Sequence, residues 1–144
     1  MFLGEYRHTI DTKRRLAIPV KFRDELGLKA ILARGLDNCL FVYPQKAWDD
    51  LAQKLNALPT GQSSTRSFVR LMLAGAFEGE PDRLGRILIP DQLCQFAGFK
   101  KRVVVAGVFS RLEIWDEQRW DEYRKKAEAS GDEIAEKLGE LGVY

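Results

Sequence analysis

An internal repeat constrains this chain more than any other feature of its sequence. Residues 11–19 (DTKRRLAIP) match residues 82–90 (DRLGRILIP) at an offset of 71 positions. At the same offset Gly4, Tyr6 and Gly27 match Gly75, Phe77 and Gly98. A repeat at a fixed period indicates two copies of one structural unit, so we expect a pseudo-two-fold pair within one chain.

The match resumes further along at an offset of 72. There Gly35 meets Gly107, Leu40 meets Leu112, and the pair Trp48-Asp49 meets Trp120-Asp121. Between these positions the apolar run 31–33 aligns with 103–105, and 41–43 aligns with 113–115. The agreement of apolar positions indicates that both copies present the same faces to a core.

Each copy predicts the same order of elements: two strands around a turn, a short helix, two more strands and a longer amphipathic helix. In the first copy we expect strands at 2–8 and 15–18, a helix at 20–26, strands at 30–33 and 40–43, and a helix at 44–58. In the second copy we expect strands at 75–79 and 86–89, a helix at 91–97, and strands at 102–106 and 112–115. Pro19 and Pro90 suit the first position of the short helices, and Gly27 and Gly98 suit their ends.

The domain plan that follows has four parts. Residues 1–58 form the first repeat, 59–74 a connector and helix, 75–130 the second repeat, and 131–144 a helical tail. The connector is rich in turn residues, and one of its Ser or Thr side chains is expected to cap a helix over 66–74. Because a half of about 55–60 residues has few ways to cover its strand edges, we expect the halves to interleave. The predicted fold class is α+β and rich in strands, with flanking helices.

Charge is nearly balanced overall and uneven along the chain. There are 23 Lys and Arg residues against 21 Asp and Glu residues, for a net charge of +2. Residues 1–34 carry +4, whereas residues 113–144 carry −5. Such a split can orient a molecule on an anionic partner, or let the basic end of one subunit meet the acidic end of the next. Chance clustering on a solvated surface is the third reading.

Other classes of protein are poorly supported. No apolar run approaches the ~18–20 residues of a membrane span, and the N-terminus lacks the pattern of a secretion signal. Cys39 and Cys94 are too few for a disulfide framework, so we expect a cytoplasmic protein. His8 is the only histidine, and no glycine-rich phosphate loop is present. We therefore expect no catalytic residue, metal, cofactor or small-molecule substrate.

The doubled Asp-x-x-x-Arg pattern is the strongest functional signal. Asp11 and Asp82 are expected to shape the turns through hydrogen bonds from their carboxylates to backbone N–H groups. Arg15 and Arg86 follow where the second strands begin, and arginine suits bidentate contact with guanine or phosphate. Two such hairpins side by side would fit the major groove of DNA. The alternative is that both pairs are only ion pairs within a turn, each worth under ~1 kcal/mol.

This double motif resembles the MraZ family, the two-repeat branch of the AbrB/SpoVT swapped-hairpin superfamily. The resemblance covers nearly the whole chain and includes the opening Met1-Phe2-x-Gly4 and the two Trp-Asp pairs. It implies a nucleoid-associated, DNA-binding transcriptional regulator encoded at the head of a division and cell-wall gene cluster. Such a protein is expected to repress its own operon through short G-rich direct repeats and to form a ring of identical subunits. The second hypothesis is an antitoxin-like or scaffold module whose main partner is another protein.

The residue roles follow from this hypothesis. Arg15 is the leading base-reading residue, and Arg86 is its weaker counterpart. Phosphate contacts are assigned to four residues, Lys13, Arg14, Arg7 and Arg83. The second turn is less basic, because Leu84-Gly85 stands where the first has Lys13-Arg14. Three aromatic residues are expected in the core: Trp48, Trp120 and Phe77.

Overall fold

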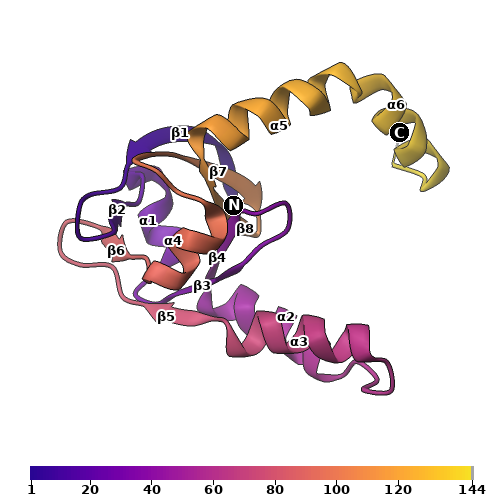
Figure 1. Ribbon diagram of the computed structural model, residues 1–144, viewed down its shortest axis with the longest axis horizontal. Coiled ribbons are helices and arrows are strands. Elements are labelled where there is room, and N and C mark those ends of the chain that lie inside the picture. Colours follow the sequence, from indigo (N-terminus) through magenta and orange to yellow (C-terminus); the bar gives the residue numbers. More distant parts are fainter. Residues whose placement is uncertain (144) are drawn as a thin grey trace.

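The computed structural model describes residues 1–143 and shows an α+β fold rich in strands (Figure 1). The first half contains β1 (Phe2–Thr9), β2 (Arg15–Ala17), α1 (Val20–Leu26), β3 (Ala30–Arg34), β4 (Leu40–Pro44), α2 (Gln45–Asn56) and α3 (Ser63–Ala74). The second half contains β5 (Phe77–Gly79), β6 (Arg86–Leu88), α4 (Asp91–Ala97), β7 (Arg102–Phe109), β8 (Arg111–Asp116), α5 (Glu117–Ala129) and α6 (Gly131–Glu140). The predicted order of elements thus occurs twice, from β1 to α2 in the first repeat and from β5 to α5 in the second.

Six of the strands form one antiparallel sheet in the order β1-β7-β8-β4-β3-β5. The first strand of each repeat pairs with a strand of the other repeat, because β1 lies beside β7 and β5 lies beside β3. The two repeats also meet at the centre of the sheet, where β4 pairs with β8. The large sheet is therefore formed by strands of both repeats together.

The remaining strands, β2 and β6, form a separate two-stranded sheet that also joins the repeats. Leu16 lies opposite Ile87 at its centre, and both side chains are fully buried. Because side chains alternate along a strand, the flanking residues Arg15, Ala17 and Arg86 face the other way. This small sheet and its two turns lie together at the left of the molecule in Figure 1.

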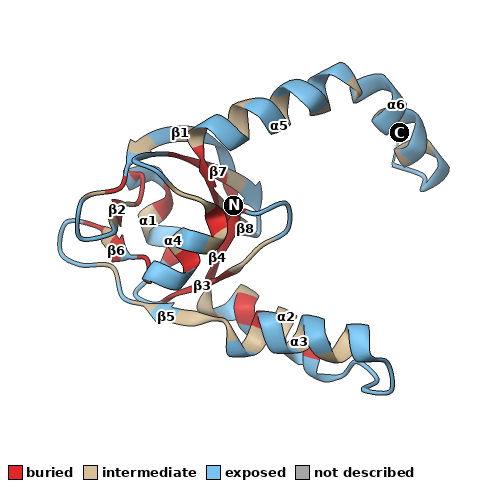
Figure 2. Cartoon of the chain, viewed as in Figure 1, coloured by how far each residue is buried: buried red, intermediate tan, exposed pale blue. Residues whose placement is uncertain are grey.

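Buried apolar side chains form two clusters on opposite faces of the large sheet. Ala30 and Leu32 of β3 belong to the first cluster, and Ile31 and Ala33 belong to the second. The first cluster is covered by α1, α4 and the small sheet, and the second by α2 and α3. Figure 2 shows this burial in the sheet, whereas α5 and α6 are exposed along most of their length.

The three aromatic residues predicted for the core do contribute to it. Trp48 is buried in the second cluster, and Trp120 packs against the same cluster. Phe77 packs against the first cluster. The predicted helix ends at Gly27 and Gly98 are confirmed, and both glycines have a positive φ, 77° and 64°.

Several details of the sequence interpretation are wrong. α3 begins at Ser63 and not at residue 66, and Gln62 precedes it without a side-chain cap, so the expected Ser or Thr cap is absent there. Pro19 and Pro90 stand one residue before their helices. α5 is also unlike α2, because none of its residues is fully buried.

The alignment of β3 with β7 is wrong as well. Val103 and Val105 occupy the inward positions of Ala30 and Leu32, so the structural offset in this strand is 73. The first inward residue of β3, Ala30, lies three residues after Gly27, whereas its equivalent in β7, Val103, lies five residues after Gly98. Two extra residues between Gly98 and β7 therefore cause this shift. Gly35 and Gly107 are therefore not structural equivalents.

The predicted helical tail is present as α6, and the last residue of the tail lies outside the described residues. No helix among residues 1–143 is long and apolar enough to cross a membrane.

Removing a buried side chain from the small sheet should destabilise the whole chain, because this sheet holds the two repeats together. We expect Leu16→Ala to lower the free energy of unfolding by about 2–5 kcal/mol. Leu88→Ala on the partner strand is the control, because Leu88 is 55% exposed and its loss should change stability by about 0.5 kcal/mol or less. Urea unfolding of both variants provides the measurement. Equal losses of unfolding free energy in the two variants would contradict the role of the small sheet in holding the repeats together.

Candidate nucleic-acid interface

The first turn is built around the carboxylate of Asp11. Its Oδ1 accepts hydrogen bonds from the backbone N–H groups of Lys13 (2.9 Å) and Arg15 (2.8 Å). Its Oδ2 accepts a hydrogen bond from Nε of Arg15 at 2.7 Å. Backbone bonds from Arg14 N–H to Asp11 C=O and from Asp11 N–H to Arg15 C=O, both 3.0 Å, close the turn. Asp11 thus fixes both the backbone and the arginine side chain.

The second turn repeats this arrangement around Asp82. Its Oδ1 accepts hydrogen bonds from the N–H groups of Leu84 and Arg86, both at 2.9 Å. Its Oδ2 accepts a hydrogen bond from Nε of Arg86 at 2.8 Å. The hydrogen-bonding role predicted for the two aspartates is therefore present in both turns.

Backbone hydrogen bonds hold the two turns side by side. Ile18 N–H donates to the carbonyl of Gly85, and Ile89 N–H donates to the carbonyl of Arg14, both at 2.9 Å. In the ladder between them Arg15 lies opposite Leu88 and Arg86 lies opposite Ala17. The two arginines therefore lie on the same outward face, two ladder steps apart, which corresponds to roughly 7 Å along the strands.

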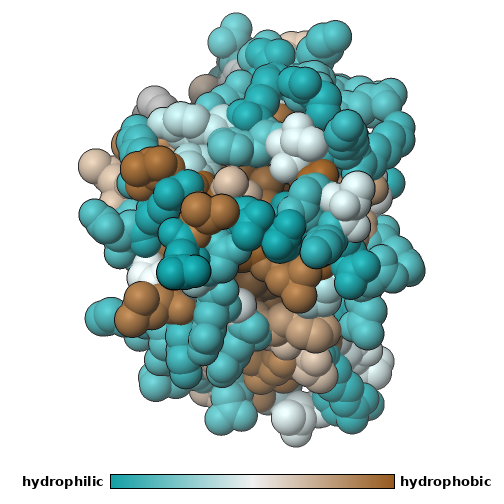
Figure 3. Space-filling view, turned by 90° about the vertical axis from the view of Figure 1, so that its left-hand side faces the viewer, coloured by the Kyte–Doolittle hydropathy of each residue, from teal (hydrophilic) through white to brown (hydrophobic). Residues whose placement is uncertain are grey.

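Basic side chains surround this ladder. Lys13, Arg14 and Arg83 are exposed, and none of them forms an ion pair within residues 1–143. The side chains of Arg15 and Arg86 are 33% and 29% exposed, and each uses Nε for its aspartate. Figure 3 faces this end of the molecule and shows a mainly hydrophilic surface with apolar side chains between the polar ones. We call the five basic residues and the β2–β6 ladder the basic ridge.

Arg14 has a backbone conformation that favours glycine. Its φ is 61°, and the equivalent residue of the second turn, Gly85, has a φ of 74°. A left-handed conformation costs a residue with a side chain about 1–2 kcal/mol. Such strain at an exposed cation is typical of a functional position.

Arg7 is not part of the basic ridge. It lies on β1, where its Nη2 is 2.9 Å from Oδ1 of Asp121 and its Nη1 is 3.3 Å from Oε2 of Glu117. The hydrogen bonds that Arg7 donates to these two carboxylates raise the pKa of Arg7 above its ordinary value. Arg7 thus links β1 to α5.

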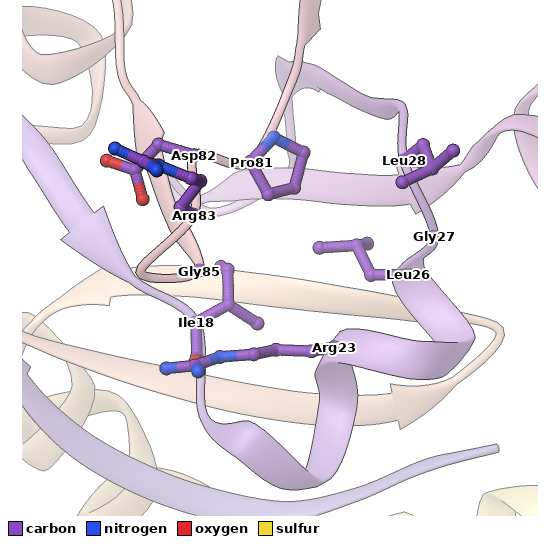
Figure 4. A pocket seen from close by; sticks show the side chains of 9 residues that line it. All are labelled: Ile18, Arg23, Leu26, Gly27, Leu28, Pro81, Asp82, Arg83 and Gly85. Carbon is purple, nitrogen blue, oxygen red and sulfur yellow. The ribbon is translucent and has the colours of Figure 1, made fainter.

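A cavity of about 200 Å³ lies between the second turn and α1 (Figure 4). Arg23 of α1 and Arg83 of the turn both line it, together with Asp82 and Gly85. Arg23 was not predicted from the sequence as a site residue, because its repeat partner at the offset of 71 is Cys94 and not a second arginine.

Residues 1–143 contain no group of three or more His, Cys, Asp or Glu side chains that could hold a metal ion. Both cysteines are free, and burial raises the pKa of Cys39 and of Cys94 above their ordinary values. Their thiols are therefore protonated and weakly nucleophilic at neutral pH.

The turn aspartates should make stability depend on acid pH. Hydrogen bonds from the backbone N–H groups of Arg15 and Arg86, followed by those from the arginine side chains, lower the pKa values of Asp11 and Asp82 below 3.8. A lowered folded-state pKa stabilises the fold above the unfolded-state value, and this contribution is lost as the pH falls through the folded value.

We therefore expect the stability difference between the wild type and the Asp11→Asn/Asp82→Asn double variant to shrink as the pH falls below about 4. Chemical unfolding between pH 6 and pH 2.5 measures this difference. Asp50→Asn on exposed α2 is the control for general charge loss. A difference that stays constant over the whole range would contradict the role of the carboxylates.

Known proteins resemble this chain over its full length. The family model described as "MraZ protein, putative antitoxin-like" matches it twice, over residues 1–71 and 72–140. A protein of Moorella thermoacetica is 49% identical over 143 residues, which cover 99% of this chain and 100% of the relative. A protein of Carboxydothermus hydrogenoformans is 50% identical over 138 residues, 96% of each chain. A third, from Desulforamulus reducens, is 48% identical over 141 residues, 98% of this chain and 99% of the relative.

All three relatives are named "Transcriptional regulator MraZ". The two matched segments each contain one Asp-x-x-x-Arg turn, and the identity extends beyond these turns to the whole chain. The chain therefore belongs to the MraZ family.

Proposed function

We propose that this protein is a transcriptional regulator that binds double-stranded DNA in a sequence-specific manner through the basic ridge. The observation that carries the proposal is the pairing of two identically built Asp-Arg turns on one outward face. A two-stranded ribbon has the width to enter the major groove. The exchange of strands between the repeats supports the swapped-hairpin arrangement expected for this superfamily.

The ion pair to aspartate suits Arg15 and Arg86 for reading bases. A guanidinium presents five N–H donors in one plane, and each aspartate engages only Nε. The terminal nitrogens remain for a bidentate contact with O6 and N7 of guanine, the commonest specific contact in the major groove. Holding the side chain in advance also lowers the entropy lost on binding. An ion pair within the turn and a role in DNA binding are thus compatible.

The phosphate contacts are assigned to the exposed cations around the arginines. Lys13 and Arg14 directly precede Arg15, and Arg83 precedes Arg86 in the second turn. Such contacts add affinity without reading sequence, and they make binding depend on salt. Arg7 is left out of this set, because Asp121 and Glu117 already engage it.

The regulatory role that we propose is repression of the protein's own division and cell-wall operon through short G-rich direct repeats, with association to the nucleoid. Guanine-rich sites match the arginines of the basic ridge. A single chain with a net charge of +2 offers limited affinity, whereas linked copies on repeated sites gain from effective concentration.

Ring-like assembly of identical chains would provide these linked copies. Exposed apolar side chains occur at opposite edges of the large sheet: Leu36 and Leu71 near β3, and Leu3 and Phe109 on β1 and β7. Two different apolar surfaces suit head-to-tail contacts, which close into rings when the rotation allows.

The second candidate function is binding of another protein through the arm formed by α5 and α6. This arm projects from the body of the molecule in Figure 1. Ile134 and Leu141 of its end are exposed. Deletion of residues 131–144 decides this alternative: loss of a copurifying partner, with DNA binding and assembly unchanged, would favour it.

Replacing the leading arginine should weaken specific binding. We expect Arg15→Ala to lose about 1–3 kcal/mol of binding free energy on the protein's own upstream DNA, about 5- to 150-fold in Kd. The same variant should lose much less binding free energy on a scrambled duplex. Fluorescence anisotropy with both duplexes at two salt concentrations measures the effect.

Lys13→Ala is the matched control, because Lys13 lies in the same turn and makes no side-chain bond to Asp11. It should weaken binding to both duplexes alike. It should also reduce the magnitude of the negative slope of log K against log salt by about one unit. Equal losses on both duplexes for Arg15→Ala would refute base reading. No binding of the wild type to either duplex would refute the proposed function.

Assembly should depend on the apolar surface beside α3. We expect Leu71→Asp, which places a charge on a side chain 54% exposed, to reduce a multimer to smaller species or to the single chain of 16.4 kDa. Light scattering after gel filtration gives the mass. Gln53→Asp on α2 adds the same charge elsewhere and should leave the mass unchanged. An unaltered mass for Leu71→Asp would exclude this surface from the contact.

A further inference from the structure

Among the differences between the two turns of the basic ridge, one falls at the residue with the positive φ. At the third residue after the aspartate, the first turn has Arg14 and the second has Gly85. At the fourth residue of the following helix, α1 has Arg23 and α4 has Cys94. Both arginines belong to the first repeat, but α1 lies beside the second turn, so each turn has one of them: Arg14 within the first turn and Arg23 next to the second.

Arg23 lies directly on the second turn. Its Nε donates a hydrogen bond to the carbonyl of Ile18 at 2.8 Å. A Cβ atom added to Gly85 would stand 2.3 Å from Nε and 2.5 Å from Cζ of Arg23. Gly85 is buried, whereas Arg14 is exposed in the first turn. The side chain of Arg23 thus occupies the space that a side chain at position 85 would need.

Cys94 takes the corresponding place beside the first turn. Its Sγ points to the carbonyl of Ile89, at 3.7 Å, as Nε of Arg23 points to Ile18. A thiol is much shorter than an arginine side chain, so it leaves room for the side chain of Arg14. The residue at the helix position therefore affects how much space is left for a side chain in the turn.

The surroundings of Arg23 suit an anion. Arg23 forms no ion pair within the described residues, and Asp82, the acidic group lining the same cavity, is already bonded to Arg86. Arg83 lines the cavity as well. Figure 4 shows the side chain of Arg23 beside Ile18 and below Gly85, with the turn carrying Asp82 and Arg83 above it.

We propose that Arg23 binds a DNA phosphate at the second turn and replaces there the cation that Arg14 supplies at the first. This inference rests on the proposed function, because it places the contact at the edge of the same basic ridge. It also explains why the second turn keeps a cationic group although Leu84-Gly85 replaces Lys13-Arg14.

The test measures how binding of a fluorescent duplex depends on salt. Arg23→Cys copies the residue of the other repeat. It should reduce the magnitude of the negative slope of log K against log salt by about one unit, for cognate and scrambled duplexes alike. Lys54→Gln on α2 removes the same charge far from the turns and should leave the slope unchanged. A wild-type slope in Arg23→Cys would overturn the proposal.

An exchange variant separates binding from folding. Gly85→Arg alone should lower the Tm by about 3 °C or more, because the new side chain meets Arg23 at a positive φ. Gly85→Arg combined with Arg23→Cys reproduces the pairing of Arg14 with Cys94 at the first turn, so we expect it to regain Tm relative to Gly85→Arg and to restore the wild-type salt slope. A double variant that regains Tm and keeps the reduced slope would show that a cation at position 85 does not substitute for Arg23, and it would overturn the proposed equivalence of Arg23 and Arg14.

The outcomes distinguish this inference from the proposed function. Binding by the wild type that depends on Arg15 but not on Arg23 would refute the Arg23 contact alone. No binding of the wild type to either duplex would refute both.

Discussion

The structure depends on backbone pairing between the two repeats at the small β2–β6 sheet. Each turn gives a carbonyl, that of Arg14 or of Gly85, to an N–H group of the opposite repeat. Fully buried Leu16 and Ile87 lie between these bonds and join the first cluster of the core. Because unpaired backbone groups in such a place would be costly, the relative position of the turns is set by the fold and not by their side chains. The basic ridge is therefore available before any ligand binds.

The repeated motif allowed much of this arrangement to be predicted. Asp11 and Asp82 bond to the same backbone positions in both turns, because a short carboxylate near a turn has few other donors within reach. The order of strands and helices also followed from the apolar pattern. The register of β7 did not, because the extra residues before it shift the alignment and a run of three valines looks the same at either offset. Only the pairing with β8 shows that Val105, and not Val104, faces the first cluster.

Long-range contacts explain the other differences. Arg7 is a basic residue near the first turn in the sequence, yet it meets Asp121, which lies 114 residues away. Its charge and position in the sequence gave no indication of this partner. α5 has the Trp-Asp pair of α2 but packs on Trp115 through Trp120 and Tyr123, with ring centroids 5.4 and 4.8 Å from that of Trp115, and none of its residues is buried. Similar sequences in the two repeats thus lead to a helix on the sheet in one case and a projecting arm in the other.

The two turns also show how a duplicated unit can diverge while its backbone stays the same. Positions 14 and 85 both have a positive φ, which glycine adopts at little cost and arginine does not. Strain at Arg14 is tolerated because the hydrogen bonds of Asp11 and the bond from Ile89 fix the turn from both sides. Gly85 avoids that strain, and the space above it is filled by Arg23 from the neighbouring helix. Because a side chain added at position 85 would meet Arg23, positions 23 and 85 are physically coupled. The asymmetry between the repeats is thus set by packing around the turns, while the Asp-Arg pairs keep the two arginines of the ladder equivalent.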